Sequence, residues 1–156
     1  MLSRPIEAAA FNKNGPHFLN ITLNSGTTML RDLALAAKAA CSKDDQESLI
    51  PLILSLRELG EKAKKRGILS LEGDLSTIED RFLKIGMQLI IDKTESQIVC
   101  DILDSDIYYN ESNGRELLKK VIIREGVLRI QAGDTSRNIF LCTRIFLGKV
   151  DDSAFS

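Results

Sequence analysis

Residues 58–74 read ELGEKAKKRGILSLEGD and residues 82–92 read FLKIGMQLIID, and together they indicate two helices joined by a break. Before the break, apolar residues recur at intervals of three and four, the period of an amphipathic helix: Leu52, Ile53, Leu56, Leu59 and Ala63. This helix ends in cations that suit the negative end of its dipole: Lys62, Lys64, Lys65 and Arg66. Gly67 then loosens or bends the chain.

The second helix is predicted to begin near Ser76, because Ser76 and Glu79 have the spacing of a capping box. A third helix follows, since Thr94 and Gln97 repeat that spacing ahead of another apolar pattern. Three aspartates of this third helix are predicted to form a solvated face: Asp101, Asp104 and Asp106. We expect the second and third helices to pack together and to bury Phe82, Leu83, Leu89, Ile98 and Ile102.

Further helices are predicted on both sides of this centre, at residues 29–41 and 117–124. The fold class that follows is mainly α, a compact domain of five to six helices spanning residues 29–150. Residues 1–28 form an irregular N-terminal segment before it. A minor β element near the termini stays open, since residues 17–23 also suit a short strand.

The segment at residues 115–148 supports two interpretations. REGVLRIQAGDTS at residues 124–136 echoes KRGILSLEGDLS at residues 65–76, which favours a diverged repeat and helical structure. The rival interpretation is a hairpin within residues 127–146, because the flanking runs are β-prone and Ala132-Gly133-Asp134 suits a turn. We expect helix.

Composition excludes several classes of function. The net charge is −1, from 21 basic and 22 acidic residues, which gives no basic surface for nucleic acid. No apolar run reaches the length of about 18 residues that a membrane span needs. Cys41, Cys100 and Cys142 are widely spaced, so we expect reduced thiols in a cytosolic protein and no metal site. His17, the only histidine, has no nucleophile beside it, and the sequence predicts neither catalytic residues nor a cofactor.

The central stretch resembles a known family. Lys64-x-Arg66-Gly67-Ile68-Leu69-Ser70-Leu71-Glu72, followed by Phe82-Leu83-x-x-Gly86-x-x-Leu89-x-x-Asp92-x-Thr94, is similar to the cytoplasmic part of the flagellar stator subunits MotA and PomA. The resemblance covers residues 52–109. It departs from the family at Lys93, where the family usually has Gly, and in the membrane helices, which the sequence does not predict.

The resemblance implies a role for the central charges. In the family, a basic residue eight positions before the Leu-Glu glutamate, together with that glutamate, meets charged residues of the rotor. These positions correspond to Lys64 and Glu72 here, with Lys65 and Arg66 as neighbours. The alternative is purely structural, with Lys64 capping a helix dipole and Glu72 starting a loop.

The resulting hypothesis is a non-enzymatic, MotA-like protein-interaction domain that docks on a rotor or stator component of the flagellar motor. The resemblance places it in the cytoplasm, peripheral to the inner membrane at the motor, and leaves a homo-oligomer open. One alternative is a diverged paralogue that acts as a cytoplasmic scaffold or regulatory adaptor outside the motor. Another is a small enzyme with no recognisable site.

Overall fold

The computed structural model describes residues 33–155, which contain seven α-helices and two short 3₁₀ helices and no strand. The α-helices are α1 (Leu33–Lys38), α2 (Lys43–Glu47), α3 (Ile50–Arg66), α4 (Arg81–Ile91), α5 (Ser96–Tyr109), α6 (Gly114–Gln131) and α7 (Ser136–Arg144). The 3₁₀ helices are η1 (Ile68–Asp74) and η2 (Asp152–Phe155). The mainly helical fold is confirmed. The helices outnumber the five to six expected because they include α2, which is only 5 residues long and lies where no helix was predicted.

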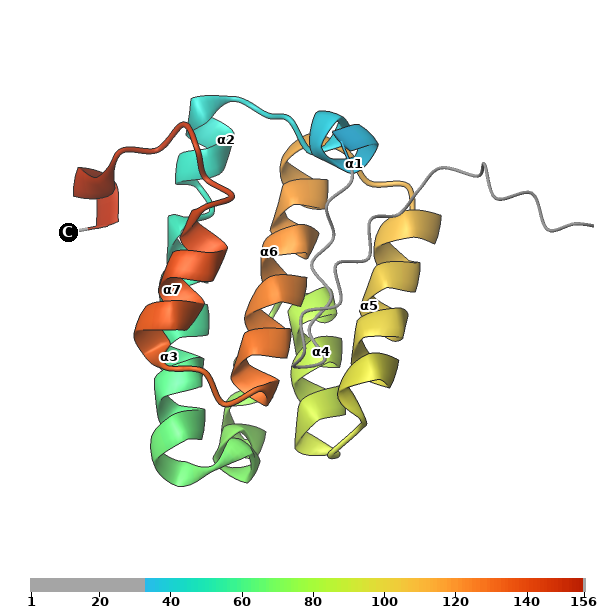
Figure 1. Cartoon of the computed structure of the whole chain (residues 1–156), viewed down its shortest axis with the longest axis vertical. Coiled ribbons are helices and arrows are strands. Elements are labelled where there is room, and N and C mark those ends of the chain that lie inside the picture. Colours follow the sequence, from blue (N-terminus) through green and yellow to red (C-terminus); the bar gives the residue numbers. More distant parts are fainter. Residues whose placement is uncertain (1–32, 156) are drawn as a thin grey trace, which may run out of the picture.

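Helix α6 lies at the centre of the domain, with α3 and α7 on one side of it and α4 and α5 on the other (Figure 1). It contacts all four of these helices. A helix enclosed in this way has no face left for solvent along its middle. Accordingly, every residue in the unbroken run at 121–128 is buried, including the charged pair Arg124 and Glu125.

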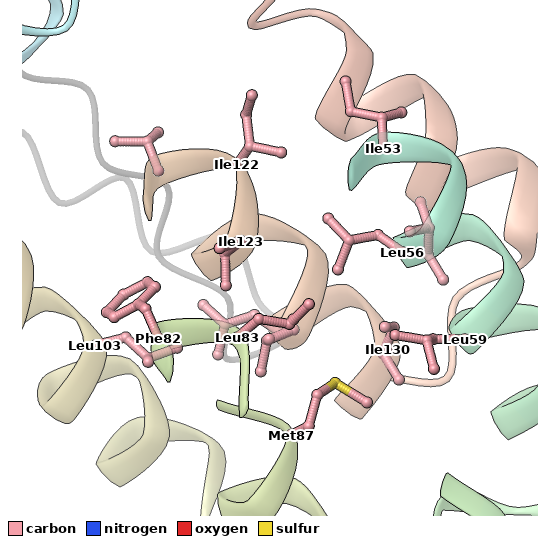
Figure 2. Packing of buried hydrophobic residues seen from close by; sticks show 14 of the residues in the cluster. Ile53, Leu56, Leu59, Phe82, Leu83, Met87, Leu103, Ile122, Ile123 and Ile130 are labelled. Carbon is pink, nitrogen blue, oxygen red and sulfur yellow. The ribbon is translucent and has the colours of Figure 1, made fainter. Parts of the chain in front are cut away.

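Two glycines let the helices approach α6 closely. A Cβ built on Gly126 of α6 would lie 2.7 Å from Leu56 Cδ1 of α3. A Cβ on Gly86 of α4 would lie 2.9 Å from Val127 Cγ2 of α6. Side chains of α3, α4, α5 and α6 form a common hydrophobic core, part of which Figure 2 shows around Leu56 and Met87.

The predicted core is confirmed at Phe82 and Leu83, confirmed only in part at Leu89, and wrong at Ile98 and Ile102. Phe82 and Leu83 are buried, and Leu89 is half-buried. Ile98 and Ile102 are instead exposed by 48% and 41%. The residues that α5 turns inward are Val99, Cys100, Leu103 and Ile107. Two of them, Val99 and Leu103, each directly follow one of the exposed isoleucines. Both stripes have helical spacing, and packing against α4 and α6 selects between them.

The start of α4 differs from the capping-box prediction. The helix begins at Arg81, and the Asp80 carboxylate accepts a hydrogen bond of 2.9 Å from the Leu83 backbone N–H. Ser76 and Glu79 lie in the connection before it. An Asp at the N-cap satisfies a backbone donor that the helix leaves free, so Asp80 fixes the start.

The end of α4 holds Lys93 in a backbone conformation that favours glycine. Lys93 has a φ of 60°, in the left-handed region. Its backbone N–H donates to Ile90 O, and the Thr94 N–H donates to Leu89 O, which is a Schellman motif. Gly133 ends α6 with the same pattern and a φ of 73°. Thr94 therefore closes α4, and α5 begins at Ser96 rather than from a Thr94–Gln97 capping box.

Residues 127–146 contain the end of α6, a turn and α7, so the hairpin interpretation is wrong. The two echoing stretches nevertheless have different local structures. Residues 68–74 form a 3₁₀ helix after α3 has ended, whereas residues 127–131 continue α6. The predicted N-terminal segment at residues 1–28, the strand at residues 17–23, His17 and the beginning of the helix at residues 29–41 lie outside the described residues. No helix in residues 33–155 combines the length and the apolar character that crossing a membrane requires.

Candidate interaction surface

The family-like charges lie where α3 ends and the chain turns into η1, here called the α3–η1 end and defined as residues 64–72. Gly67 makes this turn with a φ of 83° and a ψ of 157°, and its N–H donates to Ala63 O at 2.8 Å. Figure 1 shows the α3–η1 end at the same end of the molecule as the α6–α7 turn. A glycine suits this conformation because an L side chain rarely adopts a positive φ.

η1 packs against both α3 and α4. Leu71 is 1% exposed and anchors η1 in the core. The Lys62 ammonium pairs with the Asp74 carboxylate at 2.6 Å, and the Ser70 hydroxyl donates to Gly67 O at 2.7 Å. These contacts fix the backbone that presents Leu69 and Glu72.

The four sequence-predicted site residues are all exposed, but they differ in their contacts. The Lys64 ammonium donates to Gly133 O at 2.6 Å, which ties α3 to the α6–α7 turn. Lys65 pairs with Glu61 one turn earlier, at 2.5 Å. The side chains of Arg66 and Glu72 have no partner within residues 33–155. The structure brings the four onto one end of the domain, and among the described residues the charges of Arg66 and Glu72 are unpaired.

Leu69 is a further member of this surface that the sequence reasoning missed. Its exposed fraction is 57%, and it lies between the free charges at Arg66 and Glu72 in the sequence. Neighbouring Ile68 and Leu71 pack toward the core, as the period of three in a 3₁₀ helix allows. The signal in the sequence was three apolar residues within four positions, more than one face of so short an element can bury.

Two of the three aspartates of α5 pair with cations of α6. The prediction of a solvated aspartate face is wrong for two of its three members. Asp104 accepts two hydrogen bonds from the guanidinium of Arg124, which is 2% exposed, and Asp106 pairs with Lys120 at 2.5 Å. Only Asp101 is solvated as expected. Arg124 lies twenty positions from Asp104 in the sequence, so local patterns did not reveal the pair.

The thiols and carboxylates offer no metal-binding arrangement within residues 33–155, because no three His, Cys, Asp or Glu side chains gather there. Cys41, Cys100 and Cys142 are free. Burial raises the pKa of the Cys100 thiol to about 11, although the nearby Arg124 guanidinium opposes that rise. A thiol with such a pKa stays protonated at neutral pH and is a poor nucleophile.

These observations describe a helical domain with a charged end, and the comparisons with known proteins relate part of it to a motility protein. Over 54 residues the chain is 41% identical to motility protein A of Borreliella burgdorferi. The similarity covers 35% of this chain and 21% of that protein, so the chain spans about a fifth of the length of this curated relative. No family model matches the chain, and no solved structure matches it. The partial similarity supports a MotA-like relationship.

Proposed function

We propose that this chain is a non-enzymatic, MotA-like interaction domain that docks on a rotor or stator component of a flagellar motor through its α3–η1 end. The proposal rests chiefly on one observation. Within the stretch that resembles the family, Arg66, Leu69 and Glu72 are all exposed, in the sequence order cation, apolar group, anion, and both charges are free of partners within residues 33–155.

The surface is suited to orienting a partner more than to holding it tightly. Contacts between exposed charges each contribute about 0.2–1 kcal/mol. They act mainly on the encounter rate and the orientation of the partner, and salt weakens them. Leu69 adds apolar area that a partner can cover. Because η1 is anchored by Leu71 and by the Lys62–Asp74 pair, little ordering is needed on binding.

The structure changes the weight given to each predicted residue. Lys64 already donates to Gly133 O, so removing its charge affects the α6–α7 turn as well as a partner. Arg66 has no such contact, and it is the cleaner cation for a test. Glu72 keeps the role that the resemblance implies. Lys65 is partly neutralised by Glu61.

The test is binding of the purified chain to the flagellar rotor and stator proteins of the same cell, measured at low salt and again at high salt. We expect Arg66→Glu, Lys64→Glu and Glu72→Lys to weaken binding at low salt by about twofold to fivefold each, the scale of one exposed charge contact. Lys38→Glu on α1, an exposed cation at the opposite end of the molecule, is the matched control (Figure 1).

Two results would contradict the proposal. One is equal binding of wild type and all three variants at both salt concentrations. The other is binding only to proteins outside the motor, which would favour the scaffold or adaptor alternative. Unfolding midpoints of the variants, measured beside the binding, separate a lost contact from a lost fold.

A further inference from the structure

A second surface lies between α3 and α4. Side chains of these two helices and of the connection at residues 74–80 line a cleft of about 520 Å³, which is within the usual size range of ligand sites. Its apolar lining, called its floor below, is contributed by Leu52, Leu59, Ile78 and Leu83. This feature is called the α3–α4 cleft below.

The lining of the α3–α4 cleft also contains four acidic residues, and part of their charge is neutralised from within the domain. Asp74 pairs with Lys62 at 2.6 Å, and Asp80 pairs with Lys119 at 2.9 Å. Glu58 and Glu79 also line the cleft, and both are exposed. Neither carboxylate has a partner within residues 33–155. The cleft therefore keeps two uncompensated negative charges beside an apolar floor.

This combination selects for one kind of occupant. A neutral apolar group would cover the floor and leave the carboxylates without a partner. A small hydrated cation would leave the floor exposed. An arginine side chain satisfies both features, because its stem packs on apolar surface while its guanidinium presents five donors. The hydroxyl of Ser55, which also lines the cleft and has no partner within the described residues, can accept one of them.

We propose that the α3–α4 cleft binds an arginine side chain from an apolar segment of a partner protein, with Glu58 and Glu79 as its counter-charges. The site uses none of the residues of the α3–η1 end. It stands or falls independently of the function proposed above.

The experiment uses hexylguanidinium as the probe and neutral hexylurea, which has nearly the same shape, as its matched control. Binding to the whole chain is followed by amide chemical shifts in ¹H–¹⁵N spectra. We expect hexylguanidinium to shift the signals of Ser55, Thr77 and Glu79 and to bind about threefold to tenfold more tightly than hexylurea, the effect of two exposed charge contacts. The Glu58→Gln/Glu79→Gln variant should lose this preference.

The variants keep the test falsifiable. Both glutamates are exposed and unpaired within the described residues, so the double variant is expected to fold as the wild type does, which its unfolding midpoint checks. Glu111→Gln, the same change in the α5–α6 loop outside the cleft, should leave the preference intact. Equal binding of the two probes, shifts confined to other residues, or a preference that survives in the double variant would each overturn the proposal.

Discussion

Removal of the Asp104 carboxylate should destabilise the domain far more than removal of its neighbour Asp101. The Asp104→Ala change leaves the guanidinium of Arg124, which is 2% exposed, without its bidentate partner. Breaking a buried ion pair from one side costs about 3–5 kcal/mol, because the remaining charge is buried and uncompensated. The total stability of a domain is only about 5–15 kcal/mol, so such a loss is readily measured.

The two partners should respond unequally. The side chain of Asp104 is 23% exposed, so after Arg124→Met its carboxylate can still be hydrated. We therefore expect Arg124→Met to cost about 1–3 kcal/mol, the range for a polar group left unsatisfied, and less than Asp104→Ala. The double change Asp104→Leu/Arg124→Met should recover much of the loss, because an apolar pair of similar volume often replaces a buried ion pair without penalty.

The assay is urea unfolding followed by circular dichroism, with the slope of each transition checked for two-state behaviour. Asp101→Ala on the same helix is the control, and it should change the unfolding free energy by no more than about 0.5 kcal/mol. If Asp104→Ala costs no more than Asp101→Ala, the pair contributes nothing and the aspartates are the solvated face that the sequence predicted.

Four further predictions concern two backbone positions, the loss of stability at acid pH and the Cys100 thiol. Gly126→Ala should lower the unfolding free energy by about 1–2 kcal/mol in the same urea assay, because overpacking against Leu56 outweighs the gain in helix propensity. The control is Gly73→Ala, whose added Cβ would meet no atom within 4 Å, and it should change the unfolding free energy by no more than about 0.5 kcal/mol. Lys93→Gly should raise it by about 0.5–1 kcal/mol, because glycine removes the strain of a φ of 60°; a loss would contradict the Schellman assignment. Burial alone would raise the pKa of Asp80, but the hydrogen bond from the Leu83 N–H and the Lys119 ammonium outweigh burial and lower that pKa below 3.8. The ionised Asp80 carboxylate therefore stabilises the fold fully above pH 3.8, and this stabilisation is lost as the pH falls through the lower pKa of the folded state. Urea midpoints below about pH 4 should therefore fall less steeply for Asp80→Asn than for wild type. Cys100, 3% exposed, should react with a thiol reagent only as fast as the domain opens, and rapid labelling in the native protein would refute its burial.

The sequence predicted the parts of the fold that depend on local spacing. The apolar stripe of α3 is buried at Ile53, Leu56, Leu59 and Ala63, and the chain breaks at Gly67 as expected. The choice between two equally spaced stripes on α5 was beyond local spacing. Ile98 and Ile102 are four residues apart just as Val99 and Leu103 are, and only packing against α4 and α6 turns the second pair inward.

The exposure of the four predicted side chains is confirmed, whereas their binding to a partner stays a prediction. The resemblance located the charges at residues 64–72, and all four predicted side chains are exposed. It could not show that Lys64 donates to Gly133 O, a contact across 69 positions of sequence. Nor could it show that Leu69 stays exposed while Leu71 is buried, because this depends on how η1 sits against α3. Within residues 33–155, Arg66 is the one predicted cation without a partner, and only the folded structure shows this distribution of contacts.

The central claim is that charges of the α3–η1 end meet opposite charges on a motor protein. Charge-exchange binding tests it most directly: Arg66→Glu is paired with a rotor or stator protein in which one acidic residue is reversed to Lys, and affinity is measured at low salt. We predict that the two single reversals each weaken binding and that the combined reversal restores at least half of the lost binding free energy. The claim would be contradicted if the losses of binding free energy from the two single reversals simply add, and if no acidic position tested on the rotor or stator protein restores binding.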